Sequence, residues 1–176
     1  MAIHDNWITP KTFPDDLILA KNLLYDCCGF DCSQPFSETE SATYSAYRFS
    51  INKKIICYRE AKITPTKTGQ FVTLWKRNSS GTIEPFDYLD LIDFIIISVR
   101  RENNFGQFIF PKTILLEKGI FSTSAKEGKR ATRVYPPWDI TSSKQAQKTQ
   151  QWQLDYFLEI SENKSIVSKA QKLFDI

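Results

Sequence analysis

An amphipathic helix is the first element that the pattern of apolar positions predicts. Over 12–28 the apolar residues recur at spacings of three and four, the period of one helix face, and they are Leu17, Ala20, Leu24 and Cys28. Pro14 stands in the predicted first turn, where proline is favoured, and Gly29 is expected to end the helix. The polar residues 31–41 then predict a loop.

Period-two alternation with β-branched and aromatic residues replaces the helical pattern further along the chain. It predicts strands at 42–51, 53–63, 69–78, 91–101, 103–111 and 130–135. The run 91–101 is apolar at nearly every position, which is typical of a central strand buried on both faces. The helical pattern returns at 112–119 and 144–160.

The order helix, strands, helix predicts an α/β or α+β fold, in which a central mixed β-sheet is flanked by helices. The chain shows no repeat and no linker. We therefore expect a single domain over 1–176, with a loose N-terminal segment at 1–11 and a C-terminal tail at 161–176. A hydrophobic content of 41% and an aromatic content of 14% supply a sizeable core at this length.

Neither a membrane span nor an export signal is predicted, because no apolar run approaches about 20 residues and the N-terminus lacks a basic region followed by an apolar one. We expect a cytoplasmic protein that binds no membrane. The four cysteines form no Cys-x-x-Cys pair and are expected to be buried free thiols. The single histidine, His4, excludes a Ser-His-Asp triad and a multi-histidine metal site.

Positive charge is concentrated in two blocks, although the net charge is only +3. Over 53–77 seven basic residues accompany one acid, and over 112–150 eight accompany three. The candidate phosphate-binding residues are Lys62, Lys67, Lys76, Arg77, Lys129, Arg130 and Arg133. Tyr135 and Trp138 lie within the second block, just after Arg133, and are candidates for stacking on bases. The alternatives are a solvated strand edge for the cations and core packing for the rings.

Four stretches of the chain, 61–78, 105–111, 128–139 and 145–157, together resemble the MepB family of small bacterial proteins, whose activity is not established. The strings KITPTKTGQF and RVYPPW carry most of the resemblance, which extends over about 38–160. It implies a restriction-endonuclease-like core, a mixed sheet flanked by helices. It brings no settled catalytic residues with it.

Nucleases with such a core hold magnesium with an acid on one strand and a Glu-x-Lys step on the next. Glu60 and Lys62 form such a step, and alternate positions of a strand face the same side. Glu40 is the candidate second acid, so that Glu40 and Glu60 would bind Mg²⁺ or Mn²⁺, and Gln70 could assist. The alternatives are an ion pair at the sheet surface and a degenerate site that only binds.

Three functions follow from these candidates. The first is a nucleic-acid-binding protein on a nuclease-like fold, with little or no catalysis and no cofactor. The second is a metal-dependent nuclease that uses Glu40, Glu60 and Lys62. The third is a module with a basic pocket for an acidic protein or an anionic small molecule. If a ligand surface exists, Lys62, Lys67 and the loop 128–130 should converge on one concave face.

Overall fold

The computed structural model describes residues 7–8 and 12–175. Of the predicted loose segment 1–11 it therefore describes only Trp7 and Ile8, and His4 lies outside the described residues. Trp7 is buried, and its indole N–H donates to the carbonyl of Ser33 at 3.0 Å. At this position the segment is thus packed against the body of the protein, since an apolar ring gains from burial and its N–H has found an acceptor.

A six-stranded mixed sheet forms the centre of the fold. Its order is β1 (Phe36–Ser37), β2 (Tyr47–Ile51), β3 (Lys54–Glu60), β8 (Phe94–Arg101), β9 (Asn104–Pro111) and β11 (Phe157–Glu159). β3 and β8 run parallel, and every other neighbouring pair in this sheet is antiparallel. The predicted mixed sheet is confirmed, and the predicted apolar strand β8 lies inside it.

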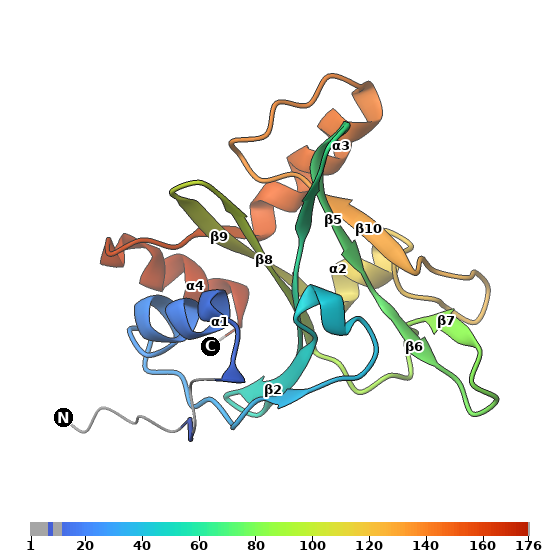
Figure 1. Ribbon diagram of the computed structural model, residues 1–176, viewed down its shortest axis with the longest axis horizontal. Helices are drawn as coiled ribbons and strands as arrows, with labels where there is room; N and C mark the ends of the chain where they lie inside the picture. The colour runs from blue at the N-terminus through green and yellow to red at the C-terminus, as the bar shows by residue number, and fades with distance from the viewer. Residues whose placement is uncertain (1–6, 9–11, 176) are drawn as a thin grey trace.

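Two smaller sheets are built from the segment between β3 and β8 together with β10. The first has the order β10 (Ala131–Val134), β5 (Lys67–Thr73) and β4 (Lys62–Thr64), and the second pairs β6 (Trp75–Arg77) with β7 (Ile83–Pro85). Figure 1 shows β5 and β10 side by side, on the opposite side of β8 and β9 from α1 and α4. β5 leads into β6, which pairs with β7.

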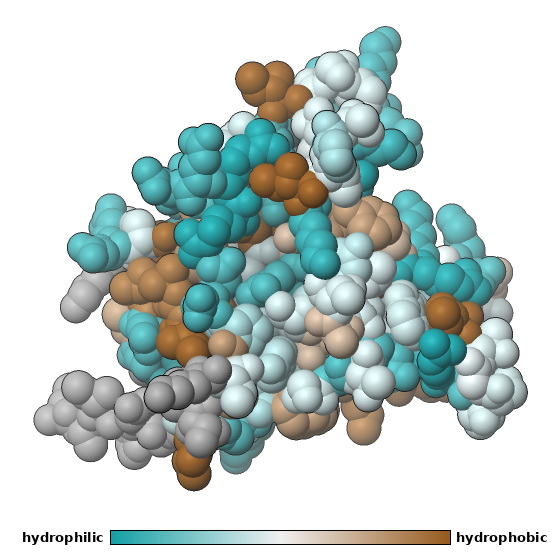
Figure 2. Space-filling model, in the orientation of Figure 1, coloured by the Kyte–Doolittle hydropathy of each residue, from teal (hydrophilic) through white to brown (hydrophobic). Residues whose placement is uncertain are grey.

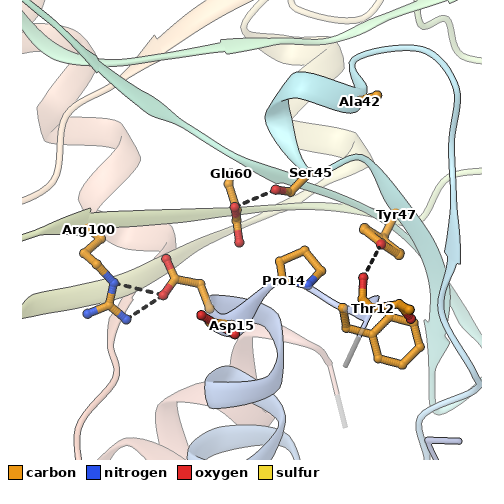
Figure 3. A pocket seen from close by; sticks show the side chains of 10 residues that line it. Thr12, Pro14, Asp15, Ala42, Ser45, Tyr47, Glu60 and Arg100 are labelled. Carbon is orange, nitrogen blue, oxygen red and sulfur yellow. Dashed lines mark hydrogen bonds and ion pairs between the residues drawn. The ribbon is translucent and has the colours of Figure 1, made fainter. Parts of the chain in front are cut away.

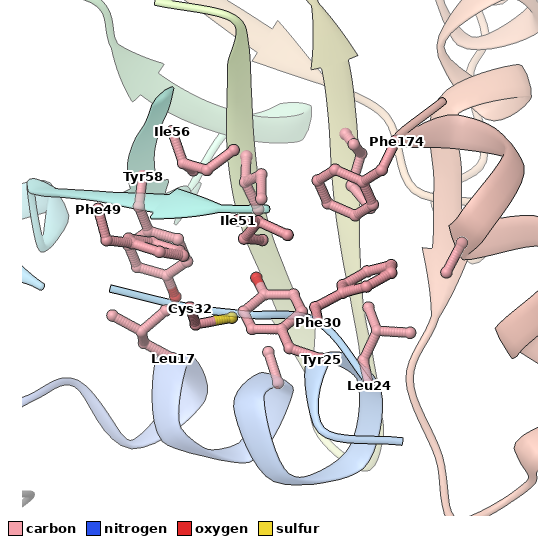
Figure 4. Close-up of a cluster of buried hydrophobic side chains, with 14 of the residues drawn as sticks. Leu17, Leu24, Tyr25, Phe30, Cys32, Phe49, Ile51, Ile56, Tyr58 and Phe174 are labelled. Atoms are coloured by element: carbon pink, nitrogen blue, oxygen red, sulfur yellow. The ribbon is translucent and has the colours of Figure 1, made fainter. Parts of the chain in front are cut away.

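Helices cover one face of the central sheet. α1 (Asp15–Ala20) continues directly into a π-helical segment, η2 (Lys21–Tyr25), and near the C-terminus η5 (Lys164–Ile166) leads into α4 (Val167–Leu173). Figure 4 shows the cluster that they bury, with Leu17 of the helix near Tyr58 of β3 and Leu24 near Phe30. The predicted first helix is confirmed, and the predicted tail 161–176 contributes α4 to this face.

The opposite face of the central sheet buries a second apolar cluster. It lies beneath β5 and β10, with α2 (Lys112–Glu117) and α3 (Lys144–Gln153) beside it. β3 serves both clusters, since Ile56 and Tyr58 face the first while Cys57 faces the second. With sheets and helices packed around the central sheet, the architecture is a mixed α+β domain, as the sequence predicts.

The predicted helix over 144–160 ends earlier, at Gln153. The chain then passes through a single 3-10 turn, η4 (Leu154–Tyr156), and becomes β11. β11 pairs antiparallel with β9, with Phe157 opposite Phe108 and their rings 4.9 Å apart. Gly106 makes room, because a Cβ there would lie 2.3 Å from the Phe157 ring. The prediction of helix was wrong here because pairing with an open strand edge outweighs local helix preference.

The predicted strand 42–51 begins later than expected, since its first residues form the 3-10 turn η3 (Ala42–Tyr44). All four cysteines are free, as predicted, but only Cys32 and Cys57 are buried, whereas Cys27 is exposed. Burial raises the pKa of Cys32 to about 12, which keeps this thiol protonated and unreactive. Among the described residues no helix is long and apolar enough to cross a bilayer.

Candidate functional site

A row of three residues crosses the outer face of the three-stranded sheet. Lys62 of β4 and Arg133 of β10 are both paired with Phe71 of β5, one from each side. Residues that face each other across antiparallel strands project to the same side. The register of the sheet therefore places the two cations on one face, although 70 residues separate them in the sequence.

Aromatic rings hold these two cations in place. The Lys62 ammonium lies 4.7 Å from the centre of the Tyr44 ring, and the Arg133 guanidinium lies 5.7 Å from the centre of the Phe71 ring. The two rings are themselves 6.1 Å apart in an edge-to-face arrangement. Arg133 also donates to the Thr64 hydroxyl at 2.8 Å. The row Lys62–Tyr44–Phe71–Arg133, which we call the basic row, is thus positioned by cation–π contacts and a neutral acceptor.

Lys67 and Lys129 line two different cavities, and Lys62 lines neither of them, so the predicted convergence of Lys62, Lys67 and the loop 128–130 on one concave face is not shown. Lys67, the first residue of β5, is exposed and lines a cavity of about 470 Å³. Lys129, before β10, is exposed and lines a groove of about 250 Å³ together with Arg133. Across residues 7–8 and 12–175, no carboxylate lies within 4.0 Å of the cationic groups of Lys62, Lys67, Lys129 or Arg133.

The other three predicted phosphate ligands have partners within the protein. Lys76 is bound by Asp87 at 2.9 Å and by Asp90 at 2.8 Å. Arg130 pairs with Glu127 at 2.7 Å. The Arg77 guanidinium lies 5.3 Å from the centre of the Trp75 ring and 3.9 Å from the Glu40 carboxylate. Each of these three cations thus has a carboxylate within 4.0 Å, so we do not assign them to the basic row.

The two predicted stacking rings are packed against the protein. The ring of Tyr135 lies on Gly69, where a Cβ would be 2.6 Å from the ring, and Trp138 meets Phe157 edge to face at 5.6 Å. The Trp138 N–H is buried. Each ring thus has one side covered by its own chain, which fits the packing alternative for these residues.

Glu60 lies at the end of β3 in a cavity of about 610 Å³, shown in Figure 3. Its carboxylate accepts hydrogen bonds from the hydroxyls of Ser45 at 2.6 Å and Tyr58 at 3.2 Å. Asp16 lines the same cavity but is bound by Arg100 at 2.6 Å. From the turn before β2, the group that contacts the Glu60 carboxylate is thus the hydroxyl of Ser45.

Glu40 does not meet Glu60. It lines a different cavity, of about 340 Å³, and its carboxylate lies 3.9 Å from the Arg77 guanidinium. Gln70 is buried and donates to the carbonyl of Arg100 at 3.2 Å. In the part of the chain that the structure describes, no group of three or more His, Cys, Asp or Glu side chains is arranged to hold a metal ion. The expected pair of metal-binding acids is thus not brought together.

The environment of Glu60 predicts a pH dependence. Burial raises the pKa of this carboxyl above its ordinary value of 4.5, against the opposing effect of the Ser45 hydrogen bond. The folded protein then keeps a proton that the unfolded chain has lost, so this group stabilises the fold at acidic pH and ceases to do so as the pH rises through the raised pKa. Unfolding free energies of wild type and Glu60→Gln, measured by denaturant from about pH 4 to about pH 8, check this.

In that comparison we expect the variant to gain stability relative to wild type as the pH increases from 4.5, and the difference to level off above the raised pKa of Glu60. Glutamine keeps one acceptor for Ser45 and carries no charge, so it removes the titration and leaves the side-chain volume unchanged. Curves that stay parallel over the whole range would show that Glu60 titrates as it does in the unfolded chain.

Sequence reasoning missed a buried charge cluster and the role of the α3 glutamines. Glu38 binds both Arg48 at 2.7 Å and Arg59 at 2.8 Å, and Arg59 is fully buried. Gln153 is also buried; its amide donates to the carbonyl of Arg133 in β10 and accepts from the backbone N–H of Tyr135, just after β10. Strand alternation could have indicated that Arg59 is buried, because it lies two residues after the buried Cys57, on the same face of β3. No comparable signal exists for Gln153.

Comparison with known proteins gives a family and a related structure. A family model described as MepB-like matches residues 38–159. A crystal structure of MepB is similar to the chain at 34% identity and a TM-score of 0.74, covering 86% of this chain and 100% of that one. The structure of a bacterial homing endonuclease is 12% identical with a TM-score of 0.41 over 88% of this chain and 95% of that one, a level at which no activity is inferred. No curated protein matches the chain.

Proposed function

The chain belongs to the MepB-like family, and we propose that it binds nucleic acid through the basic row together with Lys67 and Lys129, without efficient cleavage. The observation that carries this proposal is the register of the three-stranded sheet, which places Lys62 and Arg133 on one face on either side of Phe71. Cations that share one face and have no carboxylate nearby attract phosphates, and binding releases the counterions of the nucleic acid.

Contacts to the phosphate backbone are favoured over contacts to the bases. Tyr44 and Phe71 each have one cation of the basic row over the ring, so we assign them to holding Lys62 and Arg133 in position and not to stacking on bases. In the view of Figure 2, apolar side chains occur as separate groups among hydrophilic ones, which fits a polar ligand better than an apolar one. Phosphate contacts position a nucleic acid without reading its sequence.

Binding without cleavage is favoured by the surroundings of Glu60. Its neighbour across the cavity is the Ser45 hydroxyl, Asp16 is engaged by Arg100, and Glu40 lines another cavity. Two carboxylates that share a metal are what a Mg²⁺-dependent nuclease needs for its attacking water. The described residues offer no such pair with Lys62.

The double variant Lys62→Gln, Arg133→Gln tests the proposal. Each phosphate contact contributes about 0.9 to the slope of log K against log salt for duplex DNA, so losing two should lower the slope by about 1.8. We also expect weaker binding by the same factor for oligonucleotides of different sequence. Fluorescence anisotropy with labelled DNA and RNA, single-stranded and duplex, measures both quantities.

The matched control is Lys53→Gln, Lys54→Gln, which removes the same charge from the exposed turn between β2 and β3. This turn lies at the other end of β3 from Glu60, roughly 20 Å along the strand. We expect the control to leave the salt slope nearly unchanged. If both double variants lower the slope equally, binding follows net charge and the basic row has no special role; if wild type binds none of the probes at low salt, the proposal is wrong.

A further inference from the structure

A second cavity lies on another part of the molecule and shares no residue with the basic row. Its volume is about 340 Å³, and it is bounded by β3, β6 and the loop that precedes β8. Arg59 lines it from β3, Trp75 from β6, and Phe86 and Asp90 from the loop side. A cavity of this size accommodates a small organic molecule.

Arg59, which lines this cavity, carries a donor that has no partner among the described residues. The side chain is fully buried, and one of its terminal nitrogens donates to Glu38 and to the carbonyl of Tyr58, both at 2.8 Å. The Nε–H is buried as well, and within the described residues it has no hydrogen-bond partner. A buried donor on a charged group is costly to leave without an acceptor. A ligand that offers an acceptor beside Arg59 would satisfy it.

Glu40 brings an acceptor to the same cavity. Its nearest cation is the Arg77 guanidinium at 3.9 Å, a distance beyond a good hydrogen bond. By contrast, the Glu38 carboxylate is held by two arginines and Asp90 is held by Lys76. Glu40 is therefore the carboxylate of the lining that is available to N–H donors of a ligand.

The charge and shape of the lining narrow the class of ligand. Three cations, Arg48, Arg59 and Lys76, line the cavity with three carboxylates, Glu38, Glu40 and Asp90, so the lining favours a neutral ligand over a free anion. Trp75 and Phe86 form flat walls, and the Arg48 guanidinium lies 5.9 Å from the centre of the Phe86 ring. Aromatic rings and guanidinium planes are the surfaces on which bases stack.

We propose that this cavity binds a purine base of the guanine type. Arginine donors match the O6 and N7 acceptors of guanine, and here Arg59 supplies the unused donor. The carboxylate of Glu40 accepts from the N1–H and the 2-amino group of the same base. The binding is independent of the proposed function, because Lys62 and Arg133 do not line the cavity.

The test uses the full chain with isotope labels and free nucleosides. The Nε–H of Arg59 and the indole N–H of Trp75 are observed by two-dimensional ¹H–¹⁵N NMR, assigned with Trp75→Phe and by comparison with Arg59→Lys. We expect guanosine to shift both signals saturably. Inosine lacks the 2-amino group and should bind about tenfold more weakly, since it loses a hydrogen bond to a charged acceptor.

Two variants complete the design. Glu40→Gln, at a partly exposed position, should weaken both nucleosides but guanosine more, because inosine loses only the charge on the acceptor of its N1–H, whereas guanosine also loses the acceptor of its 2-amino group. Lys62→Gln, Arg133→Gln should bind guanosine as wild type does, whether or not it binds nucleic acid. The proposal is overturned if guanosine shifts neither signal, if cytidine binds as tightly as guanosine, or if inorganic phosphate alone shifts the Arg59 signal as guanosine does.

Discussion

Replacement of Gly69 by alanine is expected to destabilise the protein by about 3 kcal/mol, the sum of a backbone term of about 1–2 and an overpacking term of about 1–3. Gly69 has a φ of +80°, which side chains with a Cβ rarely adopt. The added methyl would also lie 2.6 Å from the Tyr135 ring and 3.0 Å from the carbonyl of Val134. For a domain of this size the melting temperature should fall by about 9 °C.

Gly81→Ala is the matched control for this prediction. Gly81 has nearly the same φ, +82°, but nothing lies within 4 Å of the position of its added Cβ. The control therefore carries the backbone cost alone, about 1–2 kcal/mol. Thermal and denaturant unfolding of both variants measure the difference, which is the contribution of close packing between β5 and Tyr135. Equal losses in the two variants would mean that the Tyr135 ring moves aside without cost.

Glu38→Gln is the second change with a large expected effect, about 3 kcal/mol of unfolding free energy. The Glu38 carboxylate is the shared partner of Arg48 and Arg59, and the Arg59 side chain is only 1% exposed. Without the charge of Glu38, the Arg59 guanidinium is left buried with no carboxylate of the described residues in contact, which is far costlier than losing a surface ion pair. Denaturant unfolding at neutral pH measures the effect.

A control and a rescue separate this charge effect from a general loss of packing. Glu40→Gln changes a carboxylate in the same turn whose single ion pair is long, at 3.9 Å, and should cost less than about 0.5 kcal/mol. Adding Arg59→Met to Glu38→Gln removes the stranded charge and should recover part of the lost stability. A double variant less stable than Glu38→Gln alone would show that the Arg59 side chain stabilises the fold without its partner.

The spacing of apolar residues was sufficient to predict those elements whose buried positions follow a regular local pattern. The first helix and the apolar strand β8 follow from their own spacing, because burial of one helix face, or of both faces of a strand, leaves a local pattern. The segment 157–159 carried no such pattern. It is a strand because β9 offers an open edge, and Gly106 leaves space for Phe157.

The candidate site was also predicted in part from the sequence, while the tertiary structure decided the rest. The sequence by itself determined that positive charge is concentrated around β4–β6 and before β10, since this depends only on composition along the chain. Only the tertiary structure decided which of these cations lie on the same face. The register between β4, β5 and β10 brings Lys62 and Arg133 to one face, whereas the fold supplies Lys76 with carboxylates from a later loop. Pairing across strands joins residues far apart in sequence, and no local period records it.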